Sequence, residues 1–431
     1  MKKIGGQIEI SKDVSFNIEK NVKNVSDFKN QIERILGKET SRILETIFAG
    51  GICLGASDIH MEPEETGIKI RVRVDGILHD VLFIEHKIYH FLLSRIKLLS
   101  GVKLNVTKKA QDGRFTILTD GKEVEIRTSV LPCKNGESVV MRILNPEKIV
   151  EIEELGIRKD IFNQFKKEIK KLNGMIILTG PTGSGKTTTL YAALKRIQNP
   201  EIKVITIEDP IEYQIKGISQ TQVDAEKGYT FLNGLRAIVR QDPDVILVGE
   251  IRDHETAKIA LQASLTGHLV LTTLHTNDAA GTIARLQSLG EKAINIGPAI
   301  NIVIAQRLVR KVCKKCVKYS PPTKEEIKML KKELSPLEKK IKVPKINKDL
   351  KIARVQGCPD CNFTGYKGIT GIFEFFLKDD EMENIILKSP SVADLRKIAR
   401  KRGMVLMRED GLMKVLKGET TIEEVDRTTK N

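Results

Sequence analysis

The sequence predicts an α/β protein whose larger part is a parallel β-sheet covered by helices on both faces. From about residue 157 onward, short apolar strands alternate with stretches of helical periodicity, a pattern typical of βαβ units. A glycine-rich segment, 180–187, directly follows one of these strands and precedes a helix-compatible stretch at 188–197, as expected at the edge of such a sheet. We expect the strands at Met175–Thr179, Val204–Ile207, Val245–Val248 and Leu269–Leu274.

Length and composition leave room for two or three domains and predict a basic surface. The chain has 431 residues, 40% of them hydrophobic, and a formal net charge of +16. A basic surface serves solubility, or it attracts phosphates, nucleic acid or an anionic membrane face. No stretch approaches the roughly 18–20 apolar residues of a membrane span, and Met1-Lys-Lys does not open a signal peptide. We therefore expect a cytoplasmic protein, whose six cysteines serve a metal or remain thiols.

The N-terminal third predicts a separate, smaller α+β domain. Residues 1–38 form a polar segment rich in Lys, Asn and Glu, with a candidate amphipathic helix at Val25–Leu36. The α+β domain follows at 39–145, and 146–156, which contains Pro146, is the expected linker. Its helices are expected at Ser41–Ile52 and His86–Leu99, and its strands at Ile68–Val74, Glu123–Thr128 and Ser138–Leu144.

The remaining residues, 157–431, are assigned to the domain with the parallel sheet. Within it, a subdomain at 308–372 interrupts the alternation of strands and helices with two cysteine pairs. This subdomain also contains a Lys/Glu-rich stretch at 321–348, which we expect to be an extruded insertion. Helices are expected to close the chain at 380–429.

Residues 180–187 read Gly-Pro-Thr-Gly-Ser-Gly-Lys-Thr, the G-x-x-x-x-G-K-T pattern of a phosphate-binding loop (P-loop). Its glycines let backbone N–H groups curl around phosphate oxygens. The Lys186 ammonium reaches the β- and γ-phosphates, and the Thr187 hydroxyl ligates Mg²⁺. The sequence therefore predicts binding of a nucleoside triphosphate. The predicted contacts are Gly180, Pro181, Thr182, Gly183, Ser184, Gly185, Lys186, Thr187 and Thr188.

Two further strands of the predicted sheet end in acidic residues. One continues into Gly249-Glu250, and the other into Glu208-Asp-Pro-Ile-Glu212. A carboxylate at such a strand end can hold the Mg²⁺ shell or orient water, and Glu208 is the candidate base. The alternative for either acid alone is a solvated loop residue or a helix cap. Two such clusters in a chain with a P-loop favour the nucleotide site.

An arginine can supply the cation that assists phosphoryl transfer at the γ-phosphate, and two arginines of the larger domain are candidates. Arg236 and Arg240 lie four residues apart on one helical face just before the strand that leads to Glu250, so both could point at the nucleotide. Arg127 and Arg142 lie on two strands near the end of the smaller domain. Without further information, each of these two is read as an exposed strand arginine in a weak ion pair.

Four blocks of the chain resemble the Walker A, Asp-box, Walker B and His-box motifs of the secretion ATPase superfamily. They occur in order at Gly180–Leu190, Ile207–Glu212, Leu235–Asp253 and Thr266–Asn277. The match is closest to type II secretion and type IV pilus assembly ATPases. It continues at Gln306–Arg310, Thr370–Glu374, Ser57–His60 and Arg71–Gly76 and covers about residues 40–429. Gly249 departs from the common form, since many P-loop enzymes keep Asp there, and only about 38 residues stand where such ATPases often carry an extra N-terminal domain.

The resemblance implies a RecA-like ATPase domain, a PAS-like N-terminal domain and a zinc-bound subdomain. It implies that Lys186 and Thr187 bind phosphate and Mg²⁺, and that Glu208 polarises the attacking water. It further implies that Glu250 supports the metal.

For the His box, the resemblance implies that His268 and His275 sense or position the γ-phosphate region. Either histidine alone would more often be a satisfied buried residue. In similar proteins, arginines at the positions of Arg127 and Arg142 reach nucleotide across an interdomain or intersubunit cleft, and the proteins form homohexameric rings.

The pairs Cys313-x-x-Cys316 and Cys358-x-x-Cys361 are separated by 41 residues. Four thiolates suit tetrahedral Zn²⁺ and leave no open coordination position, so the metal would be structural. Redox-active or free thiols are the alternative. Pilus assembly and secretion ATPases share such a knuckle, whereas pilus retraction ATPases generally lack it.

The leading hypothesis is therefore a cytoplasmic ATP-hydrolysing motor at the inner-membrane face, with ATP, Mg²⁺ and Zn²⁺ as cofactors. It would act on a polytopic membrane platform protein and, indirectly, on a pilin or pseudopilin filament. One alternative is a nucleic-acid-stimulated ATPase, such as a helicase or DNA-uptake factor. Aromatic residues make up only 4% of the chain and no basic–aromatic stripe offers stacking platforms, so no direct nucleic-acid partner is expected. A second alternative is a retraction or conjugation ATPase of the same superfamily.

Overall fold

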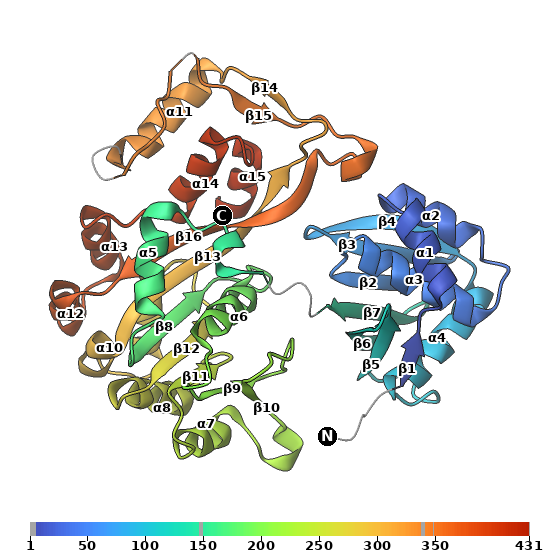
Figure 1. Ribbon diagram of the computed structural model, residues 1–431, viewed down its shortest axis with the longest axis horizontal. Helices are drawn as coiled ribbons and strands as arrows, with labels where there is room; N and C mark the ends of the chain where they lie inside the picture. The colour runs from blue at the N-terminus through green and yellow to red at the C-terminus, as the bar shows by residue number, and fades with distance from the viewer. Residues whose placement is uncertain (1–5, 146–149, 338–340, 348, 431) are drawn as a thin grey trace. The chain divides into compact units, whose positions relative to one another are not determined.

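The computed structural model describes residues 6–145, 150–337, 341–347 and 349–430. It divides into two compact units, both of which are drawn in Figure 1. The first unit comprises 1–148 together with 313–316 and 356–367, and the second comprises the rest of the chain. The cysteine-bearing segments thus group with the N-terminal residues, although the sequence assigns them to 157–431.

The first unit contains a seven-stranded sheet in the order β1-β5-β6-β7-β2-β3-β4. Strand β1 runs parallel to β5, and the other neighbours are antiparallel. The strands are β1 (Gln7–Glu9), β2 (Asp58–Pro63), β3 (Ile68–Val74), β4 (Ile77–Ile84), β5 (Gln111–Thr119), β6 (Lys122–Cys133) and β7 (Gly136–Leu144). The helices are α1 (Lys12–Asn21), α2 (Val25–Glu33), α3 (Thr40–Cys53) and α4 (His86–Ser100).

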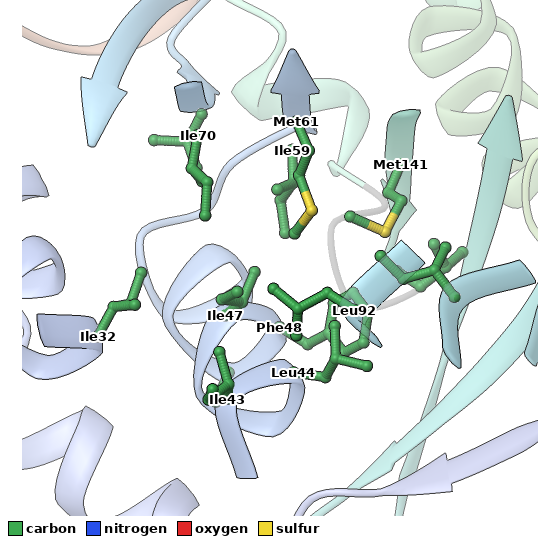
Figure 2. Close-up of a cluster of buried hydrophobic side chains, with 14 of the residues drawn as sticks. Ile32, Ile43, Leu44, Ile47, Phe48, Ile59, Met61, Ile70, Leu92 and Met141 are labelled. Carbon is green, nitrogen blue, oxygen red and sulfur yellow. The ribbon is translucent and has the colours of Figure 1, made fainter. Parts of the chain in front are cut away.

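The core of the first unit lies between α3 and one face of the sheet. Figure 2 shows the buried α3 side chains Ile47 and Phe48 on the side of α3 that faces Ile59 and Met61 of β2, and Leu44 beside Phe48. Side chains alternate between the two faces of a strand, and the burial pattern of β3 follows that alternation. One face of this sheet is therefore apolar and covered, while the other carries polar residues.

The N-terminal residues are part of this core. Strand β1 pairs with the edge strand β5, and Phe28 and Ile32 of α2 are fully buried. A Cβ atom on Gly50 of α3 would lie 2.1 Å from the Phe28 ring, so glycine allows the close approach of these helices. The sequence predicts a polar segment at 1–38, but from residue 6 onward the structure integrates it, because its few apolar residues gather on one face.

The second unit contains a seven-stranded sheet in the order β10-β9-β11-β12-β8-β13-β16, parallel from β10 to β13. Two buried clusters alternate along its strands, as expected for a sheet covered on both faces. The strands are β8 (Gly174–Thr179), β9 (Val204–Glu208), β10 (Ser219–Gln222), β11 (Val245–Val248), β12 (Leu269–Leu274), β13 (Ile300–Val312) and β16 (Tyr366–Leu377). The helices are α5 (Lys159–Glu168), α6 (Lys186–Ile197), α7 (Phe231–Val239), α8 (His254–Leu265), α9 (Gly281–Ser288), α10 (Ala293–Ala299), α12 (Asp380–Leu387), α13 (Val392–Lys401), α14 (Met407–Leu416) and α15 (Ile422–Thr429).

The Lys/Glu-rich stretch expected to be extruded contributes to a small core of its own. It forms α11 (Lys324–Leu334), whose Leu330 and Leu334 are fully buried in a cluster with Leu412 of α14 and Val425 of α15. Two short antiparallel strands, β14 (Lys318–Ser320) and β15 (Ile352–Arg354), flank it. Residues 338–340 and 348 of this stretch lie outside the described residues.

The expected linker, 146–156, is described only in part. Residues 146–149 lie outside the described residues, but Ile152 is buried in the core of the second unit and Leu155 accepts a hydrogen bond from Gly371. Across the described part of the chain, no helix has the length and apolarity that a bilayer crossing requires.

Candidate nucleotide site

The P-loop joins β8 to α6 in the second unit. Gly180, Gly183 and Gly185 have φ angles of 147°, 77° and 85°, values that favour glycine. A Cβ atom on Gly180 would lie 2.5 Å from the Gln306 carbonyl oxygen of β13, so any larger residue would collide with backbone. The sequence pattern of the P-loop is therefore required by its geometry.

Lys186 begins α6 and folds back over the loop. Its Nζ donates to the carbonyl oxygens of Gly180 and Pro181 at 2.9 and 3.0 Å. Burial lowers the pKa of this ammonium, while the nearby Glu250 carboxylate acts in the opposite direction. The hydroxyl oxygen of Ser184 is buried and has no hydrogen-bond partner among the described residues. The loop thus presents polar groups suited to an anionic ligand.

Parallel pairing brings Glu250 and His275 to the same edge of the sheet as the P-loop. Glu250 follows β11, and His275 follows β12, which pairs with β8 up to Leu274 and Thr179. His275 Nε2 lies 3.5 Å from Glu250 Oε2, and Arg252 also pairs with this carboxylate. The predicted cluster of lysine, acid and histidine is therefore assembled at the carboxyl ends of the strands, where open α/β sheets bind ligands.

Glu208 ends β9 at the same edge but is buried, with 3% of its surface exposed. Its carboxylate accepts hydrogen bonds from the hydroxyls of Tyr191 and Thr206 and from the Gln220 amide. Burial raises the pKa of Tyr191, so its hydroxyl stays neutral and donates. The candidate base is held in a network of neutral donors.

The structure places His268 away from this group. His268 precedes β12, at the strand end that pairs with Gly174, while the P-loop follows the opposite end of β8. Its Nδ1 lies 3.0 Å from the Ala263 carbonyl oxygen. Six strand residues span about 20 Å, so His268 is not at the phosphate end of its own chain. This corrects the expectation that both histidines of the box lie there.

Within the described residues, neither Arg236 nor Arg240 forms a hydrogen bond or ion pair with the P-loop of the same chain. Arg236 is exposed and pairs with Glu255 of α8 at 3.5 Å. Arg240 follows α7, and the adjacent Gln241 accepts a hydrogen bond from Lys203, which precedes β9 at the edge opposite Glu208. The predicted shared helical face is incomplete, because α7 ends at Val239 and Arg240 is its C-cap residue; both arginines are exposed.

Arg127 and Arg142 lie on the polar face of the sheet in the first unit, directly opposite each other on β6 and β7. Arg127 also faces Arg114 of β5, and Arg142 faces Asp58 of β2. Asp58 in turn faces Arg73 of β3 and lies 3.1 Å from Arg142 Nε and 3.4 Å from Arg73 Nε. We call these four arginines the arginine row. Sequence reasoning found two of its members; the others required the strand register.

The four cysteines of the two pairs lie together, with all sulfur atoms within 4.8 Å of one another. The Sγ–Sγ distances are 3.9 Å for Cys313 and Cys358, 3.8 Å for Cys316 and Cys361, and 3.7 Å for Cys358 and Cys361. A tetrahedral site with Zn–S bonds of about 2.3 Å requires S–S distances of about 3.8 Å. The geometry and the donor set therefore fit a zinc ion.

Backbone hydrogen bonds favour the thiolate form of one member of this cluster, Cys361, whereas burial raises the pKa of the Cys313 and Cys316 thiols. Cys361 Sγ accepts the N–H groups of Cys358 and Gly365, both at 3.2 Å. Burial alone would raise the pKa of the Cys361 thiol, but these hydrogen bonds bring it below its usual value, and the thiolate is the form that binds metal. Cys53 and Cys133 are not part of the cluster.

Comparison with known proteins identifies the family. The family described as "Type II/IV secretion system protein" matches residues 37–427. The chain belongs to this family. The type II secretion system protein E of Xanthomonas campestris pv. campestris is 43% identical over 90% of this chain and 67% of its own length. The type IV pilus assembly ATPase PilB of Thermus thermophilus is 45% identical over 86% of this chain and 41% of its own length.

Structural similarity agrees with that assignment. A crystal structure of the pilus retraction motor PilT with bound ADP has a TM-score of 0.60 and 26% identity, and the match covers 89% of this chain and 96% of PilT. The predicted α/β fold class and the resemblance to type II secretion and pilus assembly ATPases are confirmed. This member of the type II/IV secretion family is an ATPase.

Several residues that contact the candidate site were not predicted from the sequence. Tyr191 and Gln220 hold Glu208, and the Thr179 and Thr276 hydroxyls, 2.6 Å apart, join β8 to the loop after β12. Tyr191 lies on the helix that follows the P-loop, which is the only sequence signal for it. A loop separates Gln220 from Glu208 in the sequence. Because no local sequence pattern predicts the path of that loop, the contact between the two residues could not be predicted.

Proposed function

We propose that this secretion ATPase is a Mg²⁺-dependent motor that powers type IV pilus assembly or type II protein secretion. It acts in the cytoplasm, as a homohexamer, against a polytopic platform protein of the inner membrane. The observation that carries the proposal is the convergence of Lys186, Glu250 and His275 at one edge of the parallel sheet. Relatives named for pilus assembly and type II secretion, at 43–45% identity, support this assignment over nucleic-acid processing.

We assign each residue a role from its place relative to the P-loop. The P-loop N–H groups and Lys186 bind the triphosphate, and Thr187 ligates Mg²⁺, which would neutralise charge on the β- and γ-phosphates. Glu250 supports that ion, while His275, 3.5 Å from Glu250, lies near the γ-phosphate. Glu208 polarises the attacking water and is oriented by Tyr191.

Zn²⁺ is proposed as a structural ion held by Cys313, Cys316, Cys358 and Cys361. All four ligands come from the protein, so no position remains for substrate or water. The sulfur spacing described above supports this role over a redox role. The knuckle also favours an assembly or secretion motor over a retraction motor.

Turnover assays test the proposal. The wild-type chain should hydrolyse Mg-ATP and be stimulated by membranes that contain its platform protein. Lys186→Ala should abolish nucleotide binding or turnover, because the phosphate ligand is lost. Glu208→Gln should still bind Mg-ATP but lose at least a hundredfold in kcat. The exposed Glu201→Gln serves as the control.

The same assays separate the alternatives. Stimulation by single-stranded DNA, with no response to the platform protein, would replace the motor with a nucleic-acid-dependent ATPase. Wild-type kcat in Glu208→Gln would remove that residue from its role without affecting the motor assignment.

A further inference from the structure

Strand β13 runs along the P-loop and carries an arginine that has no role in the site described so far. The strand pairs with β8 up to Ala305 and Thr179, and Arg307 lies two residues farther on. Gln306 and Leu308 face the start of α6, because a Cβ atom on Gly185 would contact both side chains, at 2.8 and 3.3 Å.

Alternation along the strand places Arg307 on the other face of the sheet. Val303 and Ala305 belong to the same buried cluster as Ile177 of β8, so Arg307 and Thr179 continue that face. The Thr179 hydroxyl contacts Thr276, in the loop that begins with His275. Arg307 is therefore on the side of the sheet where the His-box loop meets the P-loop.

The guanidinium of Arg307 is only partly satisfied by the protein. Its Nη1 atom is buried and has no hydrogen-bond partner within the described residues, and no carboxylate within the described ranges forms an ion pair with it. Burial lowers the pKa of Arg307, and its charge also acts to lower the pKa of Lys186. Two neighbouring cations, one of which has a buried donor without an acceptor, destabilise the protein unless an anion binds to them.

We propose that Arg307 is a second phosphate-binding cation of the P-loop site and donates to the phosphate oxygens of the bound nucleoside triphosphate. The proposal rests on the nucleotide site of the proposed function and adds a residue to it. A guanidinium suits this task because its planar fork offers several donors to phosphate oxygens. The other explanation, a purely structural arginine, would require the acceptor that the surrounding side chains do not supply.

Substitution of Arg307 separates these explanations. In the full-length protein, Arg307→Gln removes the charge, and Arg196→Gln removes a charge from the exposed end of α6 as a matched control. Dissociation constants are measured for Mg-ATP and for adenosine, and the unfolding midpoint is measured with and without Mg-pyrophosphate. Pyrophosphate separates recognition of the phosphate chain from recognition of the nucleoside.

We expect Arg307→Gln to weaken Mg-ATP binding at least tenfold and to halve the midpoint shift caused by pyrophosphate. Adenosine binding and the control should be unchanged. The midpoint without ligand should stay equal or rise, because repulsion with Lys186 is relieved. Unchanged Mg-ATP affinity with a lower ligand-free midpoint would overturn the proposal in favour of a structural role.

Two further results are decisive. If Arg307→Gln does not fold, Arg307→Met, whose side chain suits the apolar strand, is measured in the same way and judged by the same outcomes. If the wild-type protein itself binds no Mg-ATP, the proposed function fails; if the wild type binds and the variants bind equally well, only the role of Arg307 fails.

Discussion

At the scale of single residues, the hydrogen bond from Tyr191 to Glu208 is the contact with the clearest chemical consequence. Glu208 is buried, so each of its hydrogen bonds fixes the direction in which the carboxylate can act. The neutral phenol of Tyr191 supplies one of them from α6, the helix that also carries Lys186. A movement of α6 would therefore displace the Tyr191 hydroxyl and change its hydrogen bond to Glu208, the proposed base.

Tyr191→Phe tests this coupling. The substitution keeps the ring and removes one donor, and we expect kcat to fall about tenfold while KM for ATP changes less than twofold. Leaving a buried carboxylate oxygen without its donor should also cost about 1–3 kcal/mol of stability. Steady-state kinetics and thermal unfolding measure the two effects, and an unchanged kcat would show that Thr206 and Gln220 suffice to hold Glu208.

At the scale of elements, the arginine row raises the question of why like charges face each other across neighbouring strands. Directly opposed like charges destabilise a sheet, and two acids offset only part of the row: Asp58 beside Arg142 and Arg73, and Glu125, 3.4 Å from Arg127. Arg142 keeps 59% of its side chain exposed, so its ion pair contributes little. Such an arrangement suits a surface that meets an anion, in line with the phosphate contact expected for Arg127 and Arg142.

Arg142→Gln should therefore lower kcat at least tenfold without loss of stability. The unfolding midpoint at low salt should stay equal or rise slightly, because repulsion with Arg127 is removed. Arg95→Gln, on the exposed side of α4, should change neither quantity. A drop in midpoint with normal turnover would identify Arg142 as a structural residue.

Glu374 of β16 joins two helices of the second unit and predicts a pH dependence. Its carboxylate accepts the N–H groups of Ala279, just before α9, and of Met407, the first residue of α14, at 3.0 and 3.4 Å. Burial raises its pKa from the ordinary 4.5 to about 7, and the charge of Asp278 acts in the same direction, against that of Arg396. Between pH 4.5 and about 7, Glu374 is therefore protonated in the folded state and ionised in the unfolded chain.

Stability should consequently fall as pH rises from about 4.5 to about 7 and level off above, by at most about 3 kcal/mol for this group. Glu374→Gln cannot ionise, so its unfolding midpoint relative to wild type should rise through the same window. A series of midpoints from pH 4.5 to 8 measures this difference. A difference that does not vary with pH would contradict the assignment.

At the scale of the whole molecule, the cysteine cluster joins segments 313–316 and 358–361, which are far apart in sequence. A zinc ion there would fix the ends of the intervening α11 segment in one place. We expect about one zinc per purified chain by elemental analysis, and a strong chelator should lower the unfolding midpoint by several degrees. Cys316→Ser should reproduce that loss, whereas Cys133→Ser, outside the cluster, should not.

The parts of the molecule that the sequence predicted are those controlled by local pattern. The strands from Met175 to Leu274 and the P-loop follow from apolar runs and glycines, because parallel pairing then brings their ends together. The arginine row, the Glu208 network and Arg307 depend on register between distant segments, which periodicity does not encode. His268 was misplaced for a related reason: a motif records spacing along the chain and not the length of the strand it spans.

Strand β1 has a practical consequence for work with this protein. It covers β5, which would otherwise lie at the border of the sheet with unpaired backbone groups, a template for association with other chains. A truncated version that starts at residue 39 would expose that border along with the pocket vacated by Phe28. Poor solubility of such a version would then reflect uncovered backbone rather than a defect of the ATPase domain.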